Sequence, residues 1–216
     1  MAAWIRRVDT RLLAALVLGV IFRPAVAAEG IPKAEYARLL DGSRDEIVRS
    51  EFVPSEERPV GEVRLVRRGP AVVMQTVLYT TLLSRVVAEI RKKDVADWPA
   101  SRRGHDDAMK YIEAIQSAQA GIQERFRRRE HRGDRRQRML IEFILSRNAS
   151  IVAIAEPALA EVGGHMRVVS RRPIAILPLS RAYVRGNIYE IAWDALKLGR
   201  KESRDLLEPM LPPETP

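Results

Sequence analysis

The residues with the clearest capacity for chemistry are eight arginines within residues 124–138. This segment holds only three acids, so its net charge of +5 is more than half of the formal net charge of +9 of the chain. Guanidinium groups bind phosphate and carboxylate oxygens through paired hydrogen bonds. The segment is therefore the candidate anion-binding or partner-binding site, and its arginines are Arg125, Arg127, Arg128, Arg129, Arg132, Arg135, Arg136 and Arg138.

Three interpretations of this basic segment stay open. It could be a solvated connection between two helices, a peripheral contact with anionic lipid or polysaccharide of a cell envelope, or a docking site for an acidic protein. A membrane-embedded amphipathic helix is not expected, because residues 127–138 have no apolar face. Nucleic acid is not expected as a partner, since Phe126 is the only nearby aromatic residue that could stack on a base.

The residue types that usually bind metals are scarce. There is no Cys, and the three histidines are His105, His131 and His165. The cluster most similar to a metal site is His105 with Asp106 and Asp107, but three adjacent residues on a helix cannot all face one ion. Acids in a first helical turn instead complement the helix dipole. We therefore expect no metal site and no cofactor.

Motifs for catalysis are also missing from the sequence. It contains no glycine-rich phosphate loop, no nucleophile elbow and no H-E-x-x-H zinc motif. Glu113, Glu142 and Glu156 are candidates for general acid/base chemistry, but no spacing forces them together. The sequence therefore predicts no catalytic residue, and we lean towards a protein that is not an enzyme.

The N-terminal residues have the pattern of a secretory signal peptide. Basic Arg6, Arg7 and Arg11 precede an apolar run at residues 12–22, and an A-x-A cleavage pattern follows at residues 25–27. The run is too short to span a bilayer, which takes about 20 apolar residues. We expect cleavage near Ala27 or Ala28 and a periplasmic or secreted protein with no transmembrane segment; an uncleaved anchor and a twin-arginine signal are the alternatives.

Composition and the positions of proline and glycine residues divide the rest of the chain. The 216 residues are 46% apolar and 30% charged, which is typical of one globular domain. We expect a signal peptide at residues 1–27, a polar lead-in with short helices at 28–60, a helical α+β domain at 61–208 and a Pro-rich disordered tail at 209–216.

Apolar periodicity predicts mostly helices. The fold class is predicted to be mainly α (α+β), a domain of about four main helices with a small two-stranded element as an option. Short helices are expected at residues 33–40 and 44–51, and longer ones at 70–94, 106–126, 136–155 and 187–198. Residues 61–68 and 165–176 are expected to be extended.

Two segments of the chain are similar to each other. Residues 61–70 and 164–173 match at five of ten positions, at a constant offset of 103 residues. The two could pair as strands of a small sheet in a degenerate two-fold arrangement, or the match could be a coincidence in an Arg- and Val-rich chain.

These observations favour an exported, non-catalytic accessory or interaction protein that presents its Arg-rich surface to an anionic envelope component or a protein partner. The alternative is a helical periplasmic enzyme whose arginines hold a small anionic substrate. A helical subunit of a larger complex is a third option. A pocket with convergent arginines and a buried glutamate would favour the enzyme, and a flat or convex basic surface would favour the interaction protein.

Overall fold

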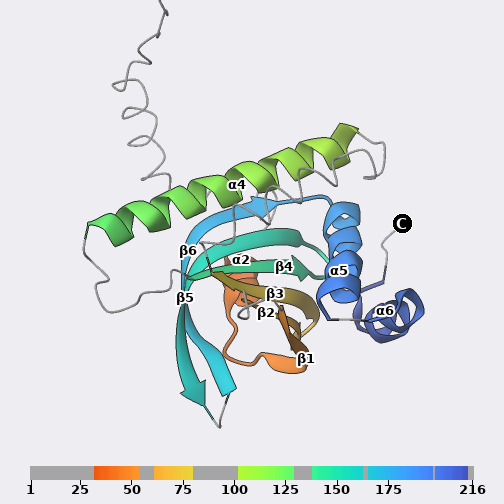
Figure 1. The fold of residues 1–216 in the computed structure, drawn as a ribbon. Coiled ribbons are helices and arrows are strands. Elements are labelled where there is room, and N and C mark those ends of the chain that lie inside the picture. The colour runs from red at the N-terminus through yellow and green to blue at the C-terminus, as the bar shows by residue number, and fades with distance from the viewer. Residues whose placement is uncertain are drawn as a thin grey trace, which may run out of the picture.

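A computed structural model describes residues 32–53, 61–79, 102–128, 138–162, 165–196 and 198–213. Strand outweighs helix in this part of the chain, 43% against 40%, so the predicted mainly helical domain is wrong. Within the described residues, six strands form one antiparallel sheet in sequence order, with four helices packed on it (Figure 1). The strands are β1 (Glu46–Val53), β2 (Gly61–Arg68), β3 (Ala71–Tyr79), β4 (Arg138–Leu145), β5 (Ser150–Val162) and β6 (His165–Pro178).

The helices lie before, between and after the strands. Helix α2 (Lys33–Leu40) precedes β1, and α4 (Arg102–Arg127) lies between β3 and β4. Helices α5 (Arg181–Ala195) and α6 (Arg200–Leu207), with the 3₁₀ turn η1 (Glu208–Met210), follow β6. No helix among the described residues is long and apolar enough to cross a bilayer.

One face of the sheet, here called the helix face, packs against α4 and α5 (Figure 1). Alternate residues of the central strands point to this side, as the period of two in a strand requires. They meet the apolar stripe of α4 and the buried side of α5. Members of this core include Leu65, Met74, Phe143, Ile115 and Val184.

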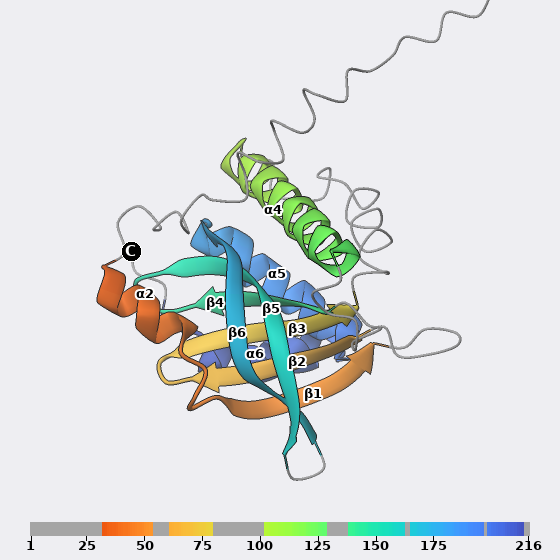
Figure 2. The same ribbon diagram turned by 90° about the vertical axis from the view of Figure 1, so that its left-hand side faces the viewer.

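The opposite face, here called the pocket face, has two different covers. At one end α2 places Leu39 against Val66, Val73 and Ile144. At the other end the long β5–β6 hairpin bends across the sheet, and Figure 2 shows it crossing over β1, β2 and β3. Leu159 and Val168 of this hairpin pack against Val77, Leu140 and Ala155. The sheet is therefore covered on both sides at its centre.

Several predicted elements are confirmed. Residues 33–40 form α2 and residues 61–68 form β2, with the predicted bounds. The amphipathic segment 106–126 lies within α4, and the extended segment 165–176 lies within β6. The last predicted helix, 187–198, overlaps α5, which begins earlier because the side chain of Ser180 caps the backbone N–H of Tyr183.

Three predicted helices are wrong where the structure describes them. Segment 44–51 contributes to β1, residues 71–79 of the predicted helix 70–94 form β3, and segment 136–155 contains β4 and the start of β5. Residues 71–78 and 139–145 are all buried. Strands that are covered on both faces have continuous apolar runs without alternation, so their residues also fit helical spacing.

Of the two alternatives for segments 61–70 and 164–173, the pairing as strands is not found in the described sheet. Both contain strands, but β2 pairs with β1 and β3, whereas β6 pairs with β5. Pro70 does not open a helix, because it follows Gly69 in the two-residue turn that joins β2 to β3. Gly69 has a φ of +55°, which a glycine adopts at no steric cost.

Candidate functional site

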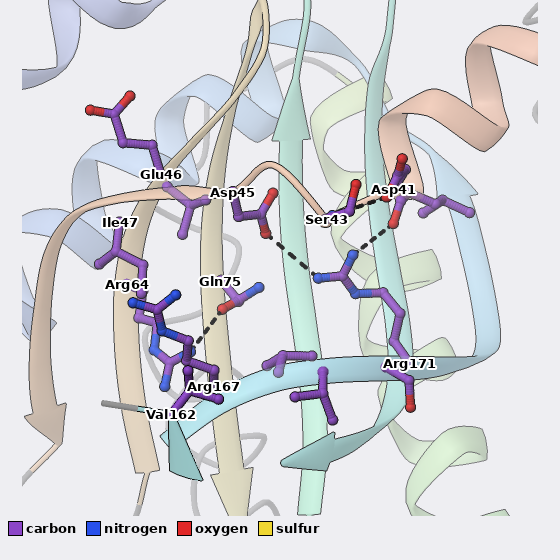
Figure 3. Close-up of a pocket in the computed structure, with 16 residues that line it drawn as sticks. Asp41, Ser43, Asp45, Glu46, Ile47, Arg64, Gln75, Val162, Arg167 and Arg171 are labelled. Atoms are coloured by element: carbon purple, nitrogen blue, oxygen red, sulfur yellow. Dashed lines mark hydrogen bonds and ion pairs between the residues drawn. The ribbon is translucent and has the colours of Figure 1, made fainter. Parts of the chain in front are cut away.

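A pocket of about 730 Å³ opens on the pocket face (Figure 3). Its floor includes Arg64, Val66 and Gln75 of β2 and β3. One wall is the connection from α2 into β1, from Leu40 to Ile47, and the other is the β5–β6 hairpin. The hairpin residues that line it are Val162, Arg167, Val168, Val169, Ser170 and Arg171.

Polar side chains form a row across the three strands below this pocket. Arg64 of β2 pairs in register with Gln75 of β3, and Gln75 pairs with Glu142 of β4, so the three side chains lie on the same face. Arg64 donates to the Gln75 Oε1 atom at 3.4 Å, and the Gln75 Nε2 atom donates to Glu142 at 2.8 Å. All three are buried, and Glu142 is only 1% exposed.

Arg68 joins this row to the connection between α2 and β1. Its guanidinium donates to Glu142 at 2.7 Å, to both carboxylate oxygens of Asp45 at 2.6 and 2.8 Å, and to the Leu39 carbonyl at 2.8 Å. Burial alone would lower the pKa of Arg68, but the hydrogen bonds and charges of Asp45 and Glu142 outweigh it, so the pKa is raised. Arg68 is held as a cation inside the protein.

Arg171 of β6 completes the wall. It donates to the Leu40 carbonyl at 2.7 Å, and its Nη2 atom lies 3.4 Å from Glu142 and 3.6 Å from Asp45. Together with Arg68 it satisfies carbonyls at the C-terminus of α2, where a cation also complements the helix dipole. Its Nε atom is buried and has no hydrogen-bond partner among the residues that the structure describes.

The acids that line the pocket are already engaged. Asp41 accepts a hydrogen bond from the Ser43 backbone N–H at 2.9 Å, and this bond lowers the pKa of Asp41. Asp45 binds Arg68, and Glu46 lies 3.6 Å from Arg67. Each carboxylate at the pocket therefore has a partner within the protein.

By contrast, two arginines at the pocket have N–H donors with no acceptor in the described part of the chain. Arg167 lines it and is exposed, and its side chain has no ion-pair or hydrogen-bond partner in the described part of the chain. The Nε atom of Arg171 adds a second unused donor. Figure 3 shows Arg167 near Arg64 and the floor. The arrangement is suited to accept an anion.

The three glutamates considered for acid/base chemistry do not converge. Glu142 points to the pocket face, whereas Glu156 binds Arg125 of α4 at 2.9 Å, and α4 packs on the helix face. Glu113 is exposed on α4. No group of three or more His, Asp or Glu among the described residues could hold a metal ion. His105 is exposed, and Asp107 accepts a hydrogen bond from the backbone of Ser180 at 2.7 Å.

The structure describes four of the eight arginines in the predicted basic site. Arg125 binds Glu156, and Arg128 binds Glu124 at 3.1 Å. Arg127 is exposed at the end of α4, and Arg138 is the first residue of β4. None of these four lines the pocket. The other four, Arg129, Arg132, Arg135 and Arg136, lie outside the described residues.

Sequence reasoning missed Arg64, Arg68, Gln75 and Arg171. A signal was present at two positions of this network. Gln75 and Glu142 are polar residues inside otherwise apolar runs, and such residues in a buried strand need partners. The arginine partners come from β2 and β6, and only the folded sheet brings them to the same place.

Comparison of the sequence with protein-family models, with curated proteins and with solved structures found no match.

Proposed function

We propose that this chain is an exported, non-catalytic binding protein that holds a small anionic ligand in the pocket of the pocket face. One observation carries the proposal. Every acid at the pocket has a hydrogen-bond or ion-pair partner in the protein, whereas the Arg167 side chain and the Arg171 Nε atom have none among the described residues. An anionic group supplies the acceptors that these donors lack. Export rests on the signal-peptide pattern of residues 1–27.

The proposed anion site is the pocket and not the basic segment at residues 124–138. Convergent arginines beside a buried glutamate are the arrangement expected of the enzyme alternative, which also holds a small anion. They therefore support a small anionic ligand, and the contacts of the glutamate decide whether catalysis accompanies binding. Arg127 is the last residue of α4 and Arg128 follows it, and α4 packs on the other side of the sheet. A contact of the basic segment with an envelope component would be a separate activity, and the experiment below distinguishes the two sites.

Catalysis by Glu142 is disfavoured as an alternative. Its carboxylate already accepts hydrogen bonds from Arg68 and Gln75 and lies beside Arg171. A general base must have a lone pair directed at the proton that it removes. The contacts around Glu142 instead hold it as a structural anion below the pocket.

Isothermal titration of the purified protein with inorganic phosphate, acetate and citrate tests the proposal. We expect at least one anion to bind, and the Arg167→Gln variant to weaken that binding at least tenfold, because a hydrogen bond to a charged group contributes about 1.5–3 kcal/mol. The matched control is Arg172→Gln, since Arg172 is an exposed arginine of β6 that does not line the pocket.

Two results would contradict the proposal. The first is that none of the anions binds to the wild-type protein. The second is that binding survives in Arg167→Gln but is lost when Arg127 and Arg128 are both replaced by glutamine. That second result would place the anion on the basic segment instead.

A further inference from the structure

We infer that the ligand is an amphiphilic anion, an acidic head group that carries an aliphatic chain. This inference rests on the proposed function and names the class of ligand for the same pocket. It depends on the apolar residues at the pocket mouth, on the irregular strands that place them there, and on the polar groups of the floor.

The mouth of the pocket carries exposed aliphatic side chains. Ile47 is 42% exposed, Val162 is 43% exposed and Val169 is 56% exposed, and all three line the pocket. Only six large hydrophobic residues are exposed in the described part of the chain, so this one opening holds half of them. Exposed apolar residues that gather at one opening are typical of a binding surface.

Local irregularities in the strands direct these residues into the pocket. In β6, Val168 pairs with Leu159 and Ser170 pairs with Ala158, so Val169 is an extra, bulged residue. A regular strand would present only alternate residues to one side, but all five residues from Arg167 to Arg171 line the pocket. The bulge therefore places apolar Val169 between the two arginines that have unused donors.

The opposite wall has an irregularity of the same kind. In β1, Ile47 pairs with Val66 and Arg49 pairs with Leu65, so Val48 is the extra residue. Ile47 lines the pocket, whereas Val48, which is also exposed, does not. Bulges in the strands of both walls are therefore next to the mouth, and bulges are frequent beside binding sites because they redirect side chains.

The polar and apolar groups lie at different depths. Arg64 and Gln75 are buried in the floor, and the Arg171 Nε atom is buried in the wall. The aliphatic groups of Ile47, Val162 and Val169 are exposed to solvent. Arg167 is exposed but lies near Arg64 and the floor (Figure 3), so a head group would lie between Arg167, Arg171 and the floor. Its chain would then cover the aliphatic residues at the mouth.

Titration with a series of straight-chain carboxylates tests this inference: acetate, butyrate, hexanoate and octanoate. We expect Kd to fall by up to about fourfold for each methylene group that becomes buried. Arg167→Gln should weaken all members of the series by a similar factor. Octyl phosphate, titrated in parallel, shows which acidic head the site prefers.

Variants of the mouth separate the chain contact from the head contact. The Val162→Ser/Val169→Ser double variant should weaken octanoate binding at least tenfold and flatten the dependence on chain length. The matched control is Val48→Ser, because Val48 is an exposed valine outside the pocket, and octanoate should bind to this variant with the affinity of the wild type. Thermal unfolding of each variant verifies that it is folded.

The outcomes distinguish the two proposals. Acetate or phosphate binding with no gain from a longer chain would overturn this inference and leave the proposed anion site intact. Octanol binding as tightly as octanoate would contradict the acidic head, and with it the proposed function. Failure of every ligand to bind would reject both.

Discussion

At the scale of single residues, the most constrained group is the carboxylate of Glu142. It is almost fully buried and accepts hydrogen bonds from Arg68 and Gln75, while Arg171 lies 3.4 Å away. The arginines Arg64, Arg68 and Arg171 are balanced by Glu62, Asp45 and Glu142. A buried charge is tolerated only with such partners, because loss of its hydration costs several kcal/mol.

Replacement of Glu142 by glutamine should therefore destabilise the protein strongly. The variant leaves the buried guanidinium of Arg68 with Asp45 as its remaining carboxylate partner, and we expect a loss of about 3–5 kcal/mol in the free energy of unfolding. Urea denaturation measures this loss. The matched control is Glu124→Gln, which breaks an exposed ion pair with Arg128 and should cost less than about 1 kcal/mol. Equal losses in the two variants would contradict the structural role given to Glu142.

At the scale of elements, the close pairing of β2 with β3 depends on a residue without a side chain. A Cβ atom on Gly61 would lie 2.3 Å from the Val77 carbonyl oxygen, a backbone atom of the neighbouring strand. The β2–β3 pairing supplies the floor of the pocket through Arg64 and Gln75. Displacement of β3 at this end would therefore disturb both the sheet and the site.

Gly61→Ala and Gly186→Ala should have opposite effects on stability. We expect Gly61→Ala to lower the free energy of unfolding by about 1–3 kcal/mol, because the strands must separate to admit the methyl group. Gly186 lies in α5 with open space around it, and alanine there should raise stability by up to about 1 kcal/mol. Thermal or urea unfolding of both variants checks the signs. A stabilising Gly61→Ala would show that the strand spacing is not fixed.

At the scale of the whole molecule, buried and partly buried tyrosines lie on both sides of the sheet. Tyr36 is part of α2 on the pocket face, and Tyr111 and Tyr183 belong to α4 and α5 on the helix face, where Tyr111 also contacts Phe143. Burial raises the pKa of Tyr36 to about 12, and it also raises the pKa values of Tyr111 and Tyr183. Each layer therefore holds a phenol that resists ionisation while the protein is folded.

Stability should consequently fall at alkaline pH. Tyrosines in the unfolded chain ionise near pH 10, whereas these three stay neutral to a higher pH in the folded state. Unfolding then releases protons, so the free energy of unfolding should decrease as pH rises through 10 towards 12 and be unaffected by these groups at lower pH. Urea unfolding at a series of pH values measures this, and Tyr36→Phe should reduce the slope. A flat profile across this range would contradict the burial of the phenols.

Elements whose two sides have different surroundings could be predicted from the amino-acid sequence. Helix α4 has a buried stripe and an exposed side, so its apolar residues recur with the helical period and segment 106–126 was predicted correctly. The short helix α2 has clear stop residues after Leu40. Segments 61–68 and 165–176 were also identified as extended, although their pairing partners were not.

The central strands and the candidate site could not be predicted from the amino-acid sequence. Strands β3 and β4 are covered on both faces, so their sequences have no alternation to separate them from buried helices. The pocket depends on contacts between residues far apart in the chain, such as Arg68 with Glu142 and Arg171 with Leu40. The spacing of apolar residues depends on the local surroundings of a segment. Which distant residues come into contact depends instead on the order and curvature of the strands. The chemistry of the pocket was therefore present in the sequence as separate residues, and the folded sheet assembled it.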